Sequence, residues 1–332
     1  MNGTGPSNGL AAASGPVEVR ADRAAFVISI DTEMAWGLVH RPDEPYTYPD
    51  ERRHLGRLLD LFDRYAVPAT WAIVGHLFLD RCSPVDGRKH PEIIRPDYDW
   101  FEGDWFDADP CSNAVAAPTW YAPDLVREIS GRAAPHEIAS HGFSHMIAGD
   151  PGCSAEAFSS EVDAALRAAA ASGVELRTFI HPRNRIGHVP LLAERGFRAF
   201  RGKRPPSTSP GPVTAALDRV IPSPGSVVHP VHQDGMWSLP ATCMFDVASR
   251  PRTWRLWILQ VERRLRQAVH HRGLFHLWFH PHNMRDAPTD AFAGLEQLCA
   301  AAARWRDRGM LNTVTMGAMA SELDAVHGER AA

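Results

Sequence analysis

The sequence predicts an α/β protein built on a parallel sheet. Short apolar runs rich in β-branched residues recur along the chain, segments with helical periodicity separate them, and polar residues follow the ends of the runs. The chain has 332 residues, of which 44% are hydrophobic, so it can bury a sizeable core, and α/β barrels of this length form single units. We therefore expect one domain over residues 23–325.

The expected strands are apolar runs of five or six residues. The first, Ala-Phe-Val-Ile-Ser-Ile at residues 25–30, is typical of a strand buried on both faces of a parallel sheet. Further strands are expected at residues 69–74, 176–180 and 274–279, and at 136–140, His-Glu-Ile-Ala-Ser, which leads directly into the histidine pair. Catalytic groups of α/β folds lie at the carboxyl ends of such strands, so the polar residues after these runs are candidates for a common site.

Helical periodicity marks the segments between the runs. Residues 51–65 place Leu55, Leu58 and Phe62 on one face, and residues 154–172 are rich in alanine and end before a glycine. A short helix is expected at residues 189–195. Residues 254–272 alternate arginine with apolar side chains. This pattern indicates a helix that coats the sheet and exposes its arginines to solvent, and it disfavours a cationic binding surface.

Three segments interrupt this pattern. Residues 1–22 consist largely of Gly, Ala, Ser, Asn and Pro without a long apolar stretch, so we expect a disordered leader and no secretion signal. Residues 82–122 and 203–225 are rich in proline and turn residues and are too long for simple connections. The aromatic and acidic residues of 82–122 fit either a substrate lid or an irregular loop anchored on the barrel, and 203–225 resembles a flexible excursion.

Charge, hydropathy and cysteine usage exclude several classes of function. The net charge of −4 without a basic stripe disfavours a nucleic-acid partner. No run approaches the roughly 18 apolar residues of a membrane span. The five cysteines are scattered and form no Cys-x-x-Cys pair, which argues against a disulfide framework or a thiolate zinc site and favours a reducing cytoplasm.

Two histidines and two carboxylates give the most specific chemical signal. His141 and His145 stand four residues apart, a spacing that puts both side chains on one face of a helical turn. A carboxylate from Asp31 or Glu33 would complete a three-ligand catalytic zinc site with a position open for water. The alternative is that both histidines cap or solvate a helix, since a chain with 17 histidines contains chance pairs.

Four motifs in order carry a family resemblance: Ser-Ile-Asp-Thr-Glu, His-Gly-Phe-Ser-His, Pro-Arg-Asn and Leu-Trp-Phe-His-Pro. Over residues 24–320 the chain resembles the polysaccharide deacetylase superfamily, the NodB-homology group of carbohydrate esterases. It looks closest to a branch in which Asp-x-Glu is followed by Trp-Gly, here Trp36 and Gly37. The resemblance implies an irregular (β/α)7-type barrel.

The resemblance also assigns roles to the motif residues. Glu33, His141 and His145 would bind the metal ion, and Asp31 would act as the base. The roles of Asp31 and Glu33 could be exchanged, because the more familiar family pattern has two adjacent aspartates. Arg183 stands at the position that holds the catalytic aspartate in relatives through a charge-assisted hydrogen bond.

His280 is the expected acid, because it follows the last strand and an imidazole with a pKa near 6.5 can release a proton at neutral pH. His276 and His282 compete for this role; His276 shares the strand parity of His280. The residues expected to contact substrate are Trp36, Trp278, His282, Asn184 and Trp105.

The sequence thus predicts a metal-dependent N-deacetylase for an acetamido sugar, either in a cytoplasmic glycan precursor, small or lipid-linked, or in a glycosylated metabolite. Zinc is preferred, although two histidines and one carboxylate also accept cobalt, nickel, manganese or ferrous iron. The alternatives are an O-acetyl esterase or another C–N hydrolase, and a catalytically silent carbohydrate-binding protein. A protein partner for the tryptophan-rich insertion is a third possibility, and the oligomeric state stays open.

Overall fold

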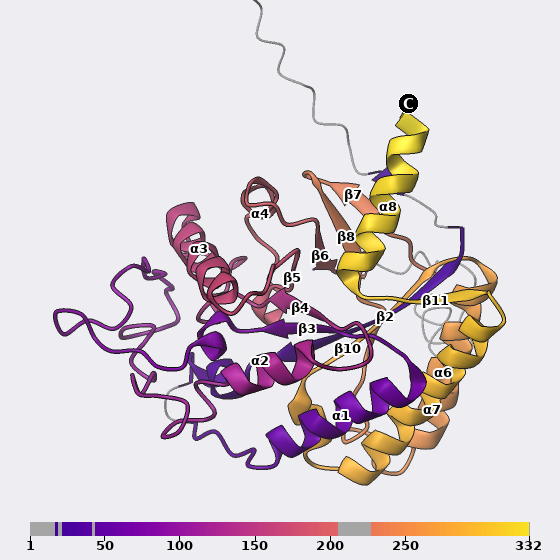
Figure 1. Cartoon of the computed structure of the whole chain (residues 1–332), viewed down its shortest axis with the longest axis horizontal. Helices are drawn as coiled ribbons and strands as arrows, with labels where there is room; N and C mark the ends of the chain where they lie inside the picture. The colour runs from indigo at the N-terminus through magenta and orange to yellow at the C-terminus, as the bar shows by residue number, and fades with distance from the viewer. Residues whose placement is uncertain (1–16, 19–21, 42–43, 205–226, 332) are drawn as a thin grey trace, which may run out of the picture.

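A computed structural model describes residues 17–18, 22–41, 44–204 and 227–331 of the chain. A curled sheet lies at the centre of the molecule and helices flank it (Figure 1). The expected α/β class is therefore confirmed. Within the described residues, no helix combines the length and the apolar character that crossing a membrane requires.

The sheet is almost entirely parallel. Its strands follow the order β1-β7-β8-β6-β5-β4-β3-β2-β10-β9, with β11 beside β2, and only the pairs β1–β7 and β7–β8 are antiparallel. All five expected strands are present. The strands are β1 (Val17–Glu18), β2 (Ala24–Thr32), β3 (Thr70–Ile73), β4 (Glu137–Ser140), β5 (Thr178–Phe179), β6 (Ala199–Gly202), β7 (Val231–Gln233), β8 (Met236–Pro240), β9 (Cys243–Met244), β10 (Leu274–Phe279) and β11 (Leu311–Thr313).

One segment joins the two edges of the parallel sheet. Its first half, β8, pairs with β6, and its second half, β9, pairs with β10. The backbone N–H of Thr242, between the two, donates to the carbonyl of His276 in β10. The parallel strands therefore curl into a barrel with seven positions, as the expected (β/α)7-type fold requires. These positions are β2, β3, β4, β5, β6, β8–β9 and β10.

The four expected helices are present, with ends that differ by at most two residues from the predicted ones. In α1, burial of Leu55, Leu58 and Leu59 follows the helical spacing of the sequence, and the Ser154 hydroxyl caps α3. The α-helices are α1 (Glu51–Tyr65), α2 (Pro123–Ser130), α3 (Ala155–Ala171), α4 (Val189–Glu194), α6 (Trp254–His270), α7 (Pro288–Asp307) and α8 (Met316–Ala331). Short 3-10 helices follow several strands: η1 (Met34–Leu38), η2 (Gly75–Phe78), η3 (Pro182–Asn184) and η5 (Pro281–Met284).

Helix α8 covers the end of the barrel that lies opposite the carboxyl ends of the strands. Its buried Met316, Met319 and Leu323 belong to one apolar cluster with inward-facing strand residues such as Val27. The half-buried Glu137 carboxylate accepts a hydrogen bond from the backbone N–H of Gly317, 2.9 Å away, at the start of the helix. This end of the barrel is therefore packed, which leaves the opposite end for the polar strand termini.

The structure refines the expectations for the irregular segments. Val17–Glu18, part of the expected leader, forms β1 and pairs with β7, whereas residues 1–16 and 19–21 lie outside the described residues. Of the insertion expected at 203–225, residues 205–226 also lie outside them. Residues 82–122 carry only isolated bridges and buried aromatics such as Phe106, in agreement with an anchored loop.

Candidate active site

Side chains from the carboxyl ends of four strands converge at a cleft of about 520 Å³; Asp31 and His280 line it, and His141 and Arg201 lie buried beneath it. Asp31 comes from β2, His141 follows β4, Arg201 lies in β6 and His280 follows β10. Asp31 faces the barrel interior because it shares the parity of the inward residues Val27 and Ser29. Most of the predicted site residues are thus brought together, as the position of their motifs at strand ends indicated.

Glu33, His141 and His145 form a cluster that fits a divalent metal ion. The Oε1 atom of Glu33 lies 3.1 Å from the Nε2 atoms of both histidines. The Nδ1 atom of His141 lies 2.8 Å from the carbonyl oxygen of Ile180 and must donate its proton there, so Nε2 of the neutral ring presents a lone pair to the carboxylate. A divalent ion between these three atoms would accept the nitrogen lone pairs and balance the carboxylate charge together.

The histidine pair is held by a loop and not by the helical turn that its spacing suggested. Gly142 and His145 both adopt left-handed backbone conformations, with φ of 77° and 65°. The buried carboxylate of Glu161 in α3 accepts hydrogen bonds from the backbone N–H groups of Phe143 at 2.8 Å and Ser144 at 2.7 Å. A carboxylate of α3 therefore replaces helical hydrogen bonds in fixing the loop.

Gly37 makes room for the carboxylate of Glu33. A Cβ atom at residue 37 would overlap Oε2 of Glu33, which follows β2 and precedes η1. Trp36 beside it is fully buried and packs against His76 with ring centroids 4.5 Å apart. The Trp-Gly pair after the Asp-x-Glu motif thus has a structural reason: Gly37 leaves space for Glu33, and Trp36 anchors the turn that carries it.

The arginine that holds Asp31 is Arg201, where the sequence indicated Arg183. The Nη1 and Nη2 atoms of Arg201 lie 2.5 and 2.6 Å from the two carboxylate oxygens of Asp31. Asn184 fixes the same guanidinium, because its Oδ1 atom accepts from Nε and Nη2 at 3.0 and 2.8 Å. Arg183 instead lies on the wall of the cleft with an exposed side chain and a φ of 54°.

Arg201 was missed because sequence patterns rank an arginine in an apolar run as a surface residue. The signal was its inward parity in the run Ala-Phe-Arg-Gly, where Ala199 also faces the barrel interior. Although burial disfavours the charged form of Asp31, the positive charge of Arg201 lowers the pKa of this carboxyl group below its usual value. Asp31 is therefore ionised at neutral pH.

His280 lies between the two carboxylates of the first motif. Its Nε2 atom is 3.4 Å from Oε1 of Glu33 and 3.6 Å from Oδ2 of Asp31. Burial opposes protonation of the ring, but the charges of Glu33 and Asp31 raise the pKa of His280 overall. The adjacent ring of His282 stacks on His280 at 4.6 Å, and burial lowers its pKa to about 4, so His282 is neutral at pH 7.

The expected substrate contacts are only partly placed in the cleft. Trp278, His282 and Asn184 line it. Trp36 and Trp105 do not: Trp36, within η1, is buried, and Trp105 is buried with its Nε1 atom donating to the carbonyl of Ser144 at 3.0 Å. Both tryptophans were expected at the substrate and instead stabilise the loops that carry metal-ligand candidates.

The segment after the first motif supplies one wall of the cleft, which sequence reasoning overlooked. It follows β2 directly and includes aromatic and apolar side chains. Its place directly after the Asp-x-Glu motif was the signal that these side chains line the cleft. These cleft residues are Met34, Leu38, His40, Arg41, Tyr46, Thr47 and Tyr48.

The protein is thus an α/β barrel of seven parallel positions with a cluster of two histidines and one carboxylate at the carboxyl ends of its strands. No protein-family model and no curated protein sequence matches the chain. Solved structures do. A Mycobacterium smegmatis protein assigned as a polysaccharide deacetylase superposes with a TM-score of 0.58 and 16% identity, covering 95% of both chains.

Two further solved structures agree with this result. A Pseudomonas aeruginosa PAO1 protein, also assigned as a polysaccharide deacetylase, gives a TM-score of 0.52 at 14% identity and covers 90% of this chain and 91% of its own. The PuuE allantoinase gives 0.54 at 14% identity and covers 91% of both chains. The chain therefore has the polysaccharide deacetylase fold that its motifs predicted.

Proposed function

We propose that the protein is a metal-dependent hydrolase that removes the N-acetyl group from an acetamido sugar, in a cytoplasmic glycan precursor or a glycosylated metabolite. The observation that carries the proposal is the convergence of Glu33 Oε1 with the Nε2 atoms of His141 and His145, beside the ionised Asp31 and the His280 imidazole. The fold shared with the solved structures described as deacetylases supports the same activity.

Glu33, His141 and His145 would hold the ion, and these nitrogen and oxygen donors suit zinc, with cobalt, nickel, manganese or ferrous iron as alternatives. When bound, a divalent ion of this kind polarises an acyl oxygen and lowers the pKa of a nearby water. The chain's own residues supply the remaining requirements of amide hydrolysis, which are a base for the water and an acid for the departing nitrogen.

Asp31 is the proposed base. It is ionised and oriented by Arg201, so one of its oxygens can accept a proton from the attacking water as the new C–O bond forms. Arg201 and Asn184 are positioning residues in this scheme: they fix the carboxylate and touch no reacting atom. The lowered pKa of Asp31 weakens it as a base but keeps it deprotonated over the neutral range.

His280 is the proposed acid. Its raised pKa favours the protonated ring near neutral pH, and its Nε2 atom faces the same space as Asp31. When the C–N bond breaks, Nε2 donates its proton to the leaving nitrogen, and the acetyl group leaves as acetic acid, which carries the hydroxyl group of the attacking water and releases its proton to solvent as acetate. The sugar then carries an amine, and transfer of the proton from Asp31 restores His280.

The cleft wall suits a sugar conjugate. Trp278 offers an aromatic face, and the neutral His282 with Arg183 offers hydrogen-bonding groups on the open side. The arginines of the cleft would favour a substrate with an anionic group, as small or lipid-linked glycan precursors carry. The proposal of a cytoplasmic substrate rests on the sequence, whose five scattered cysteines have no spacing typical of a disulfide framework.

The test is acetate release from N-acetylglucosamine conjugates before and after metal removal. We expect chelation to abolish turnover and added zinc or cobalt to restore it, in the wild type but not in Asp31→Asn. Full activity of the stripped protein would disprove the metal-dependent reaction. Metal binding with turnover unaffected by Asp31→Asn would favour a protein that binds carbohydrate without catalysis.

A different leaving group is the second candidate. The fold shared with the PuuE allantoinase motivates assays of other C–N bonds, and an O-acetyl ester would react in the same geometry because the attack does not depend on one leaving group. Parallel assays with acetylated xylose esters and cyclic ureides would separate these activities: a kcat/KM higher on either than on the acetamido sugar replaces the N-deacetylase assignment.

A further inference from the structure

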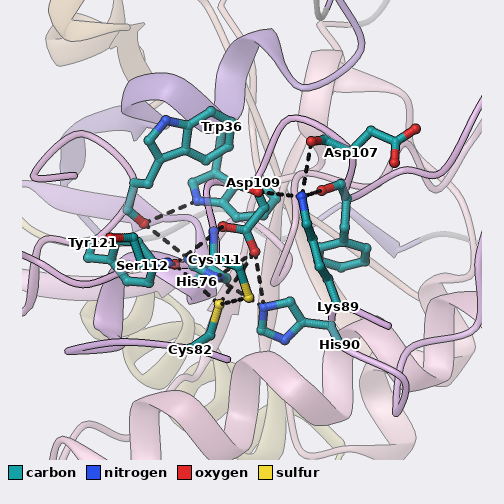
Figure 2. A network of polar contacts seen from close by, with 12 residues as sticks. Trp36, His76, Cys82, Lys89, His90, Asp107, Asp109, Cys111, Ser112 and Tyr121 are labelled. Atoms are coloured by element: carbon teal, nitrogen blue, oxygen red, sulfur yellow. Dashed lines mark hydrogen bonds and ion pairs between the residues drawn. The ribbon is translucent and has the colours of Figure 1, made fainter. Parts of the chain in front are cut away.

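A second cluster of metal-binding side chains lies behind η1. Its members are His76 in η2 and three residues of the 82–122 segment: Cys82, His90 and Asp109 (Figure 2). One ligand atom from each lies within 4.8 Å of the others. His76, His90 and Asp109 are buried, and none of the four residues belongs to the lining of the catalytic cleft.

The distances are those of ligands gathered around one point. The Nε2 atoms of His76 and His90 lie 3.1 Å apart. Oδ2 of Asp109 lies 3.5 and 3.4 Å from these two nitrogens, and the Sγ atom of Cys82 lies 3.6 Å from the same oxygen. Figure 2 shows the imidazole of His90, the thiol and the carboxylate turned toward one another.

The outer hydrogen bonds decide which histidine nitrogens are free. Nδ1 of His76 lies 3.0 Å from the carbonyl oxygen of Trp120, and Nδ1 of His90 lies 3.1 Å from Oε1 of Glu92. Both partners accept only, so each Nδ1 carries a proton, and in the neutral form of the ring each Nε2 directs a lone pair inward. Two lone pairs 3.1 Å apart and beside a carboxylate repel each other unless a cation lies between them.

We propose that His76, Cys82, His90 and Asp109 form a second metal site, distinct from the catalytic one, that binds Zn²⁺ for a structural purpose. Two imidazole nitrogens, one thiolate and one carboxylate are a complete tetrahedral zinc set, and a closed four-ligand set is typical of structural sites. The anchoring of each histidine by a carbonyl or a carboxylate is the outer-shell arrangement that metal-binding histidines have.

The site connects the 82–122 segment to the catalytic loops. The backbone N–H groups of Gly75 and His76 donate to the carbonyls of Gly142 and Phe143 at 2.7 and 2.9 Å, within the loop between His141 and His145. Trp36, three residues after Glu33, packs on the His76 ring. A metal ion bound here would therefore stiffen both chain segments that carry the catalytic ligands.

This site reverses the expectation drawn from the cysteines. Their scattered spacing argued against a thiolate zinc site, but folding brings Cys82 close to two histidines and places its Sγ atom 2.9 Å from Sγ of Cys111. The competing arrangement is a disulfide between Cys82 and Cys111, which would remove the thiolate from the metal. The metal site and the disulfide both fit the short distance between the two sulfur atoms. Only the protein with the free Cys82 thiolate can bind the metal ion through sulfur.

The decisive measurement is metal binding to the full-length protein, reconstituted with Co²⁺ and freed of excess ion by gel filtration. We expect two cobalt ions per chain and a thiolate-to-cobalt charge-transfer absorption, which the catalytic cluster cannot give because it has no sulfur ligand. Cys82→Ser should lose this absorption, while Cys153→Ser, a buried cysteine outside the cluster, should keep it. His141→Ala should lose one cobalt ion and retain the absorption.

Three outcomes would overturn the site. They are a wild-type protein that binds a single cobalt ion and loses it in His141→Ala, a wild-type spectrum without the charge-transfer band, and two thiols in the wild type that become reactive only after reduction, which would identify the disulfide. The wild-type spectrum decides even if Cys82→Ser does not fold. A further readout is stability: a chelator should still lower the Tm of His141→Ala, whose catalytic cluster is already disrupted.

Discussion

Arg201 and Asp31 form a two-point ion pair inside the barrel, with both guanidinium Nη atoms on both carboxylate oxygens at 2.5 and 2.6 Å. The two residues are 170 positions apart in the chain. Asn184 holds the guanidinium from a second direction, and the ring of Trp278 lies 4.5 Å from its Cζ atom. The orientation of the proposed base is thus fixed by a residue buried beneath the cleft.

Replacing Arg201 with lysine should impair catalysis through Asp31. Lysine keeps the charge but loses the planar fork that grips both oxygens. Because Arg201 lowers the pKa of Asp31, the variant should raise that pKa and move the acidic limb of the kcat/KM profile to higher pH. Arg183→Lys, the matched change in the cleft wall, should leave the limb in place. Identical shifts in both variants would contradict the assignment.

Asp31→Asn should abolish the base while the metal ligands stay. General-base catalysis contributes about 100- to 10,000-fold, so we expect kcat to fall by that order with metal content unchanged. Zinc content by mass spectrometry and kcat on the acetamido sugar measure the two effects. If metal is lost together with activity, Asp31 is a ligand and its role is exchanged with that of Glu33.

Gly37→Ala should weaken metal binding at the catalytic cluster without a change in any ligand. The added methyl group would overlap Oε2 of Glu33 and push the carboxylate away from His141 and His145. We expect a Kd for zinc at least about tenfold higher, as for displaced second-layer contacts of metal ligands. Gly56→Ala, within α1 with only Glu128 nearby at 3.8 Å, is the control. Equal Kd values for both variants would show that Glu33 tolerates the methyl group.

We expect the free energy of unfolding to depend on pH through Glu51. Burial, with a smaller contribution from Glu33, raises the pKa of Glu51 from 4.5 to about 8. Between these values the folded state keeps a proton that the unfolded state releases, so the contribution of Glu51 is fully present below pH 4.5 and is lost as pH rises to about 8. The slope is about 1.4 kcal/mol per pH unit.

Glu51→Gln removes this titration. Relative to the wild type, the variant should gain stability as pH rises from 5 to 8, and the two should differ by a constant amount above about pH 8. Urea unfolding at a series of pH values measures the difference. A difference independent of pH throughout this range would show that Glu51 is ionised in the folded protein.

The sequence predicted what depends on local pattern. The apolar runs predicted the strands because β-branched residues and length are local signals. The histidine spacing, the strand ends and the family resemblance pointed to Glu33, His141 and His145, which the structure brings together. The helical turn for the histidine pair was wrong, since Glu161, a residue of the next helix, supplies the hydrogen bonds of that loop. Spacing alone does not reveal a tertiary carboxylate.

The errors in the site share a cause. Arg201 was overlooked and Trp36 and Trp105 were placed at the substrate because burial of a charged or aromatic side chain is decided by contacts with distant residues. The same holds for Cys82 and His90, whose partners lie in an irregular loop without periodicity. Patterns along the chain identify which residues can do chemistry, and the fold decides which of them meet.

The strand β2 begins the barrel, yet its hydrogen-bonded neighbours include β10 and β11, which come much later in the chain: Ala25 is registered with Leu274 and with Asn312. Such long-range pairing makes ring formation slow relative to local helix formation. A nascent chain that has not yet emerged as far as β10 therefore carries Asp31 and Glu33 without His280 beside them, and the site is complete only once β2 and β10 have paired.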